Sequence, residues 1–358
     1  MTAALLDPLH LLPPPTTQPW DALRNQSPAR RIRRADGSVV TMPLPLFWYA
    51  PDWYLYPLEV SRHLAAAVAQ MGVCVAALRS EVAGGDHPSP LHDEAMPRLV
   101  PYRPERYGFQ CTDFDDAQFV DLRLTLVREP SGRFAFPPAQ VARWESDSGK
   151  EIISGGGWVE AASFPPDVAD LMHLGSKIVQ IRTLSPSAAV MVSINPIDLD
   201  NELPAILDAD PDGIILRADR FHLTGFQLAK LIQKTRRIID DRHSATLPLW
   251  IVPGPITADD AAKLVALGAS AVAIDAWCQP LREEDFRPPA SAAARLGFTD
   301  NKTPSAQSHI DAIAASHLRA SIERFTGMLL STLDGSVSDR LGTFDQAWAE
   351  TLGVRFLG

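Results

Sequence analysis

Cysteine is scarce in this chain, with three residues among 358. Cys74, Cys111 and Cys278 are odd in number and far apart in the sequence. They therefore provide neither a disulfide framework nor the close spacing of a zinc or iron–sulfur site. This usage predicts a protein of a reducing compartment, the cytoplasm, with no iron–sulfur cluster.

Long apolar runs and excess positive charge are also missing. We expect no membrane span, because no apolar stretch reaches the roughly 20 residues that cross a bilayer. The apolar N-terminus has no basic leader and carries Asp7, so it is a poor signal peptide. The formal net charge is -10, which disfavours binding to nucleic acid or anionic membranes. One basic run, residues 30–34, is interpreted as a solvated arm or a partner contact.

The composition is that of a globular protein, with 46% hydrophobic and 21% charged residues. Short apolar runs alternate with segments of helical periodicity, and alternation of this kind requires parallel strand pairing. The pattern predicts an α/β fold, a (β/α)8 TIM barrel. A doubly wound open sheet is the alternative, but no Gly-x-Gly-x-x-Gly turn follows an early strand. The expected strands are residues 44–49, 73–78, 107–111, 119–126, 189–194, 213–216, 248–252 and 270–274.

Composition also divides the chain into four parts. We expect an irregular N-terminal arm over residues 1–40, the barrel over 41–282, a linker rich in Pro, Ala and Ser over 283–308, and a helical C-terminal extension over 309–358. Within the barrel, Thr257 and Asp260 have the spacing of a helix capping box. Gly268 follows the same helix as a stop signal. Residues 128–164 fit neither a helix nor a short loop and are expected to be an insertion over the C-terminal mouth.

Several short segments follow one another in an order that is known from one family. They are Pro-Leu-Phe-Trp-Tyr-Ala (45–50), Gly84-Gly85, Arg-Tyr-Gly-Phe (106–109), Arg-Glu-Pro (128–130), Phe-Pro-Pro-Ala-Gln-Val (136–141), Ile-Ile-Ser-Gly-Gly-Gly (152–157), Val-Pro-Gly-Pro (252–255) and Leu-Gly-Ala (267–269). Over roughly residues 43 to 280 this order resembles the FMN-binding barrel of glutamate synthases.

The resemblance implies FMN at the barrel mouth and an oxidoreductase that forms an amino acid from a 2-imino acid. It implies a small-molecule substrate or an electron-donor protein as partner, and a glutaminase or a related barrel subunit beside it. Matched to the family's segments, Arg123 and Asn195 take catalytic positions. Gly84, Gly85, Thr125 and Gly254 take cofactor-binding positions.

The departures from the family pattern affect each part of the expected flavin site. Tyr49 replaces a glycine near the ring, Leu126 replaces an amide, and Asn195 replaces a lysine whose charge would stabilise reduced flavin. The phosphate turn reads Pro-Gly-Pro-Ile at 253–256, where the family has Gly-Gly-Ile-Arg, and its second proline removes a backbone donor. Asp275 would direct a negative charge toward the phosphate. These changes argue against ordinary FMN binding.

Two hypotheses therefore remain open from the sequence. The chain is an FMN-dependent oxidoreductase of the glutamate synthase type, or it is a cofactor-less barrel that serves as a binding or regulatory subunit. A third hypothesis is a flavin-free barrel that holds a phosphorylated metabolite at Gly254 and at the start of the helix after Thr257.

Other candidate positions have an ordinary structural interpretation beside the functional one. Asp121 is spaced to pair with Arg123 inside the barrel, and a satisfied internal pair is the commoner case. The remaining candidates are Trp48, Trp53 and Tyr54, as a stacking surface or a plug of the mouth; Asp86, His87, His92 and Asp93, as metal ligands or a polar loop; and Gly155, Gly156 and Gly157, as a binding lid or a flexible insertion.

Overall fold

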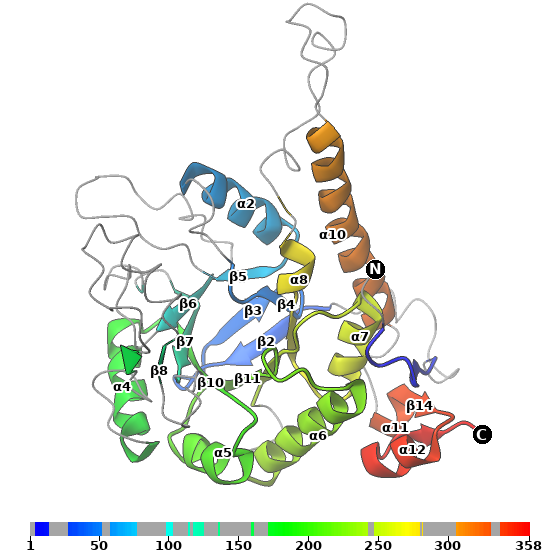
Figure 1. Cartoon of the computed structure of the whole chain (residues 1–358). Helices are drawn as coiled ribbons and strands as arrows, with labels where there is room; N and C mark the ends of the chain where they lie inside the picture. The colour runs from blue at the N-terminus through cyan, green and yellow to red at the C-terminus, as the bar shows by residue number, and fades with distance from the viewer. Residues whose placement is uncertain are drawn as a thin grey trace, which may run out of the picture.

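The barrel predicted from the sequence is present in the computed structural model. The structure describes residues 4–13, 28–51, 58–76, 98–102, 114, 117–124, 135–136, 159–160, 171–242, 247–279, 281, 306–330 and 337–358. Eight parallel strands close on themselves, because the last strand of the barrel, β13, pairs with the first, β4 (Figure 1). The strands are β4 (Leu46–Trp48), β5 (Cys74–Ala76), β6 (Arg98–Tyr102), β7 (Phe119–Arg123), β10 (Ala189–Ile194), β11 (Gly213–Arg217), β12 (Leu249–Val252) and β13 (Ala271–Ala273).

The third barrel strand is not where the sequence placed it. The expected run, 107–111, lies outside the described residues, and β6 at Arg98–Tyr102 takes the position between β5 and β7. Its register pairs Arg98 with Val75 and Leu99 with Phe119. The prediction was wrong because β6 contains Pro101, which pairs in register with Asp121, and a proline argues against a strand inside a sheet.

Helices cover the outside of the barrel, as Figure 1 shows for α4, α5 and α6. Thr257 and Asp260 form the predicted capping box at the start of α7, and Gly268, with φ of +121°, follows its end. On α4, Ile178 and Ile181 are buried against the barrel, whereas Met172 in the turn before the helix and Leu184 at its end are exposed. The helices are α2 (Leu58–Gln70), the 3-10 turn η3 (Leu171–His173), α4 (Leu174–Leu184), α5 (Leu199–Asp208), α6 (Gly225–Arg242), α7 (Ala258–Ala266) and α8 (Asp275–Cys278).

Strand alternation divides the core into an inner and an outer layer. Successive side chains of a strand point to opposite faces, so every second residue enters the barrel. Phe47, Phe119 and Trp250 meet inside, with the Trp250 ring 4.8 Å from Phe47 and 5.0 Å from Phe119 between centroids. The other face of the strands packs against the helices in a larger apolar cluster. Apolar side chains thus fill the half of the barrel nearer to where its strands begin.

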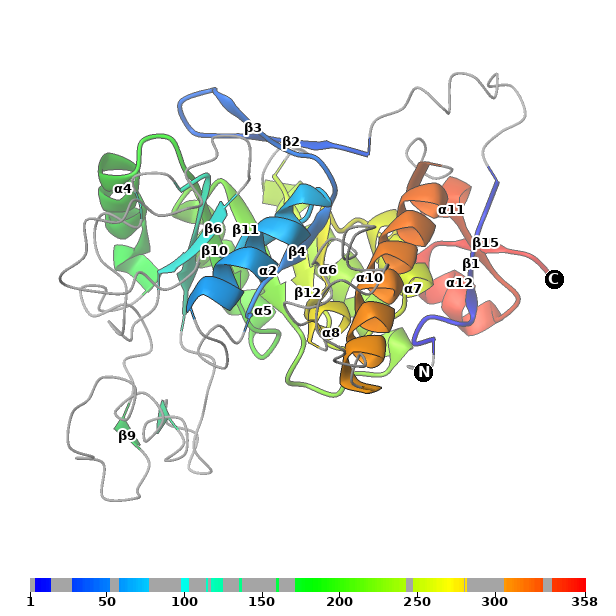
Figure 2. The same cartoon turned by 90° about the horizontal axis from the view of Figure 1, so that it is seen from above.

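The N-terminal arm, residues 1–40, was expected to be irregular, and this expectation was wrong for residues 30–33 and 39–40. The basic run forms strand β2 (Arg30–Arg33), which pairs antiparallel with β3 (Val39–Met42). Figure 2 shows this hairpin across one end of the barrel and α8 toward the other. Ile32, Val40 and Met42 are buried in the inner apolar cluster. The hairpin therefore closes the end at which the barrel strands begin.

The two ends of the described chain meet beside the barrel. Strand β1 (Leu9–Leu11) pairs antiparallel with β14 (Leu341–Thr343), and β15 (Arg355–Phe356) pairs parallel with β14. The C-terminal extension also contains α10 (Ala306–Leu330), α11 (Val337–Arg340) and α12 (Gln346–Leu352), so it is not helical throughout. Of the long expected insertion, only the antiparallel pair β8 (Ala135–Phe136) and β9 (Val159–Glu160) is described. Among the described residues, no helix has both the length and the apolarity of a membrane span.

Candidate active site at the barrel mouth

A layer of polar side chains lies above the apolar filling, toward the end at which the strands finish. The Tyr49 hydroxyl is 2.9 Å from the Ser193 hydroxyl, which donates to Asp121 Oδ1 at 2.5 Å. All three side chains are fully buried. They lie one inward step beyond Phe47, Phe119 and Met191 on their strands, so the strand alternation positions them. This group and Arg123 are called the Tyr49 network below.

Arg123 completes the network, and it forms the ion pair with Asp121 that the sequence predicted. Its Nε donates to Asp121 Oδ2 at 2.5 Å, and an Nη donates to the Tyr49 carbonyl oxygen at 2.9 Å. The guanidinium carbon lies 3.8 Å from the centroid of the Tyr49 ring, in a cation–π arrangement. A buried arginine with these partners is satisfied by the protein itself.

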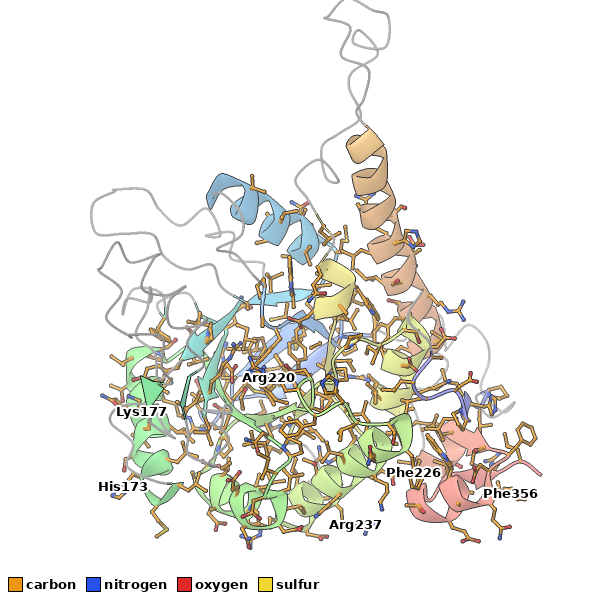
Figure 3. The ribbon with its side chains drawn as sticks, in the orientation of Figure 1. His173, Lys177, Arg220, Phe226, Arg237 and Phe356 are labelled. Atoms are coloured by element: carbon orange, nitrogen blue, oxygen red, sulfur yellow. The ribbon has the colours of Figure 1, made fainter. Side chains whose placement is uncertain are left out.

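The sequence reasoning missed Arg217 and Asp219. Both Asp219 oxygens accept from Arg217, at 3.2 Å from Nε and 2.9 Å from Nη2, and the Arg217 guanidinium carbon lies 5.0 Å from the Tyr49 ring centroid. Burial opposes the charge of Arg217, but Tyr49 and Asp219 outweigh it and raise the pKa of Arg217. Arg220, near the middle of the barrel mouth in Figure 3, lies 4.0 Å from Asp219. The signal was available, since charged residues directly after a buried parallel strand lie at the mouth.

Tyr49 is held as a neutral phenol. Burial raises its pKa to about 12, with Asp121 acting in the same direction, while Arg123 and Arg217 oppose the shift. At neutral pH the hydroxyl therefore remains available for hydrogen bonds as donor and acceptor. It provides no phenolate for catalysis.

A cavity of about 300 Å³ opens beside the network. It lies at the ends of β4, β12 and β13, with one residue from the segment after β11. Gly254, which the sequence predicted as a binding residue, is part of its wall. Its lining residues are Trp48, Tyr49, Ala50, Asp219, Val252, Gly254, Pro255, Ala273, Asp275, Ala276 and Gln279.

Asp275 lies at the place where this fold often binds the phosphate of a ligand. In β/α barrels, the turns after the seventh and eighth strands and a short extra helix often bind a phosphate. Here β12 and β13 are those strands, and Asp275 begins the short helix α8. Its Oδ2 accepts from the Tyr49 N–H at 3.2 Å and its Oδ1 from the Ala50 N–H at 2.7 Å. Burial raises the pKa of Asp275, although these hydrogen bonds and the charges of Arg123 and Arg217 oppose the shift.

The other predicted positions are brought together only in part. Gly254 has φ of +85° and lies close to Asp219, since an added Cβ would be 3.6 Å from the Asp219 Cα. Asn195 is buried at the end of β10, where its Oδ1 accepts from the Ile197 N–H at 3.1 Å, and it does not line the cavity. No group of three metal-ligand side chains occurs in the described part of the chain. The predicted positions outside the described residues are Gly84, Gly85, Thr125, Leu126, Trp53, Tyr54, Asp86, His87, His92, Asp93, Gly155, Gly156 and Gly157.

Comparison with protein-family models and with curated proteins finds no match to the sequence. Solved structures do match by fold. Flavocytochrome b2 with benzoylformate has a TM-score of 0.52 at 10% identity, covering 99% of this chain and 79% of that one. Mandelate oxidase has a TM-score of 0.51 at 15% identity with 3,3-difluoro-2-hydroxy-3-phenylpropionic acid, and 0.50 at 14% with (S)-2-phenylpropionate; each comparison covers 93% of this chain and 85% of that one.

The chain has the TIM-barrel fold of these enzymes. Identities of 10 to 15% support the fold alone, so the chemistry has to be argued from the residues at the mouth.

The described residues of the mouth do not fit FMN. The place beside Tyr49 where the flavin ring is expected is filled by the side chains of the Tyr49 network. The phosphate position holds the Asp275 carboxylate, with Asp219 on the same cavity wall. Pro255 adds no backbone donor there. An anionic phosphate beside Asp275 would meet a carboxylate where backbone N–H groups or a cation are needed, because the nearby Arg217 is already bound to Asp219.

Proposed function

We propose that this chain is a cofactor-free barrel, related in layout to the glutamate synthase barrel, that acts as a binding or regulatory module. The observation that carries the proposal is the Asp275 carboxylate, fixed by two backbone N–H groups at the ends of the strands where this fold places a phosphate. The chain's own anion thus takes the place of the cofactor's.

The electrostatic cost of FMN at this position is large. Two unit charges about 4 Å apart interact by about 4 kcal/mol at an effective dielectric of about 20. Repulsion of that size lowers affinity by about a thousandfold, since each 1.4 kcal/mol or so is a factor of ten. Burial raises the pKa of Asp275, and protonation would relieve this repulsion, but it would also weaken the hydrogen bonds from the Tyr49 and Ala50 N–H groups by removing the charge that strengthens them.

The Tyr49 network adds a second obstacle. Its members satisfy one another, and Arg123 spans from β7 to the Tyr49 carbonyl at the end of β4. A flavin ring at this place would have to displace the Tyr49 side chain. Moving it would separate a buried ion pair from its partners, which is costly in a low-dielectric interior.

The test is flavin retention by the purified chain. The protein is incubated with excess FMN, desalted and examined for flavin absorption, with calorimetric titration as a second measurement. We expect no flavin to remain with the wild type, and weak FMN binding to appear in Asp275→Asn, which removes the repelling charge. Asp200→Asn on the outer helix α5 is the control, because its exposed carboxylate pairs with Lys234 at 2.6 Å. Wild-type protein that keeps one flavin per chain would overturn the proposal.

A second candidate is the FMN-dependent oxidoreductase that forms an amino acid from a 2-imino acid. It is supported by the barrel fold shared with flavocytochrome b2 and mandelate oxidase. In this case Gly254 would approach the phosphate, and FMN would supply the hydride chemistry. An electron-donor protein would reduce the flavin. The retained flavin described above is the outcome that favours this candidate.

The partner also belongs to the proposal. A cofactor-free subunit of this kind would act beside a glutaminase or a catalytically active barrel relative. Co-expression with such a protein, followed by size-exclusion chromatography, tests the association. A complex that survives the column supports the subunit role, and separate elution at micromolar concentration argues for a free-standing binding module.

A further inference from the structure

We propose that the mouth cavity binds a small organic cation, with a primary ammonium group at the Asp275 carboxylate. This inference rests on the proposed function, because FMN would compete for the same cavity. It reverses the charge of the ligand that the fold usually takes at this place, where a phosphate is common.

The described wall of the cavity is acidic. Among the described lining residues, the charged side chains are Asp219 and Asp275, and both are acidic. Asp219 is bound through both oxygens to Arg217, so its charge is already balanced. Asp275 forms no salt bridge with any described lysine or arginine, and its hydrogen bonds come from neutral backbone N–H groups. Asp275 is therefore the wall carboxylate that lacks a directly bonded cation, while Arg123 and Arg217 act on it only at longer range.

The hydrogen-bonding capacity of Asp275 is the second step. An ionised carboxylate offers about four acceptor positions. The N–H groups of Tyr49 and Ala50 use two of them and hold the carboxylate in a fixed orientation. An ammonium carries three donors and no acceptor, so it complements the positions that remain. A fixed acceptor loses little freedom when a ligand binds, and this favours affinity.

The size and polarity of the rest of the cavity are the third step. Val252, Ala273 and Pro255 provide apolar wall, while Gln279 adds an amide at the rim. A volume of about 300 Å³ is at the small end of ligand pockets, which span about 300–1,000 Å³. The ligand is therefore a short alkylammonium rather than a long polyamine.

The experiment is calorimetric titration of the full chain with n-propylammonium chloride at neutral pH. The matched probes are 1-propanol, which has the same shape without the charge, and inorganic phosphate, which has the opposite charge. We expect saturable binding of propylammonium at one site and no binding of 1-propanol or phosphate. Asp275→Asn should weaken propylammonium binding by about tenfold or more, because hydrogen bonds to charged groups are the stronger ones. Asp200→Asn should leave it unchanged.

Each outcome decides the inference. Propylammonium that binds no better than 1-propanol overturns it, as does an equal loss in Asp275→Asn and Asp200→Asn, which would indicate surface binding. If Asp275→Asn fails to fold, the wild type decides: binding must weaken as the pH falls and Asp275 takes up a proton. A chain that retains neither FMN nor propylammonium refutes the cation site and leaves the cofactor-free proposal standing. A chain that retains FMN refutes the cofactor-free proposal first.

Discussion

Replacing Arg123 by methionine should destabilise the barrel far more than removing a surface arginine. Methionine keeps most of the side-chain volume but removes the guanidinium, so Asp121 would remain fully buried without its cation. Breaking a buried pair by removing one partner costs about 3–5 kcal/mol. The Tyr49 carbonyl would also lose its donor and the Tyr49 ring its cation. We therefore expect a cost near the upper part of that range.

The matched control is Arg242→Met on α6. Arg242 pairs with Asp208 at 3.0 Å, but 46% and 70% of the two side chains are exposed. Exposed pairs of this kind contribute about 0.2–1 kcal/mol because water already solvates both charges. The two substitutions remove the same chemical group from a buried and an exposed site, so their difference isolates the effect of burial.

The assay is urea unfolding followed by circular dichroism, with the slope of free energy against urea compared between variants. A double variant, Asp121→Asn with Arg123→Met, should recover part of the loss, since the uncompensated charge is then gone. If Arg123→Met costs no more than Arg242→Met, Asp121 is not held in a low-dielectric interior. The Tyr49 side chain could then be displaced at little cost, and the network would no longer argue against a flavin ring at this place.

Two further predictions concern the N-terminal segment and the titration of Tyr49. Gly225→Ala should lower the melting temperature and expose the N-terminal segment to proteolysis, because an added Cβ would overlap the Leu5 carbonyl. The control is Gly327→Ala in α10, where nothing lies within 4 Å of an added Cβ, and it should stabilise the protein by about 0.5–1 kcal/mol. Equal effects of the two substitutions would contradict the packing of Leu5 against Gly225. The tyrosinate absorbance that disappears in Tyr49→Phe should titrate near pH 12. Because burial raises the pKa of Tyr49 in the folded state, the buried neutral phenol contributes to stability in full below the ordinary tyrosine value near 10, and this contribution is lost as pH rises through about 12. Titration of Tyr49 near pH 10 would show that its side chain is exposed.

The sequence by itself determined the fold class and much of the helical layer. Apolar strands that alternate with amphipathic helices allow only parallel pairing, and this pattern is local. The capping box at Thr257 was predictable because its two partners are three residues apart. The pair of Asp121 and Arg123 was predictable for the same reason, since residues two apart on a strand share a face.

Only the tertiary structure decided the composition of the mouth. Arg123 reaches the Tyr49 carbonyl across 74 positions of sequence, and Asp275 accepts from the Tyr49 N–H across 226. Such contacts depend on which strands are neighbours and on how far each side chain extends into the barrel, and neither leaves a periodic signal. The hairpin β2–β3 escaped prediction because the charged residues of its basic run concealed the alternation that buries Ile32. Local pattern therefore specifies the elements, whereas closure of the barrel decides which charges share one cavity.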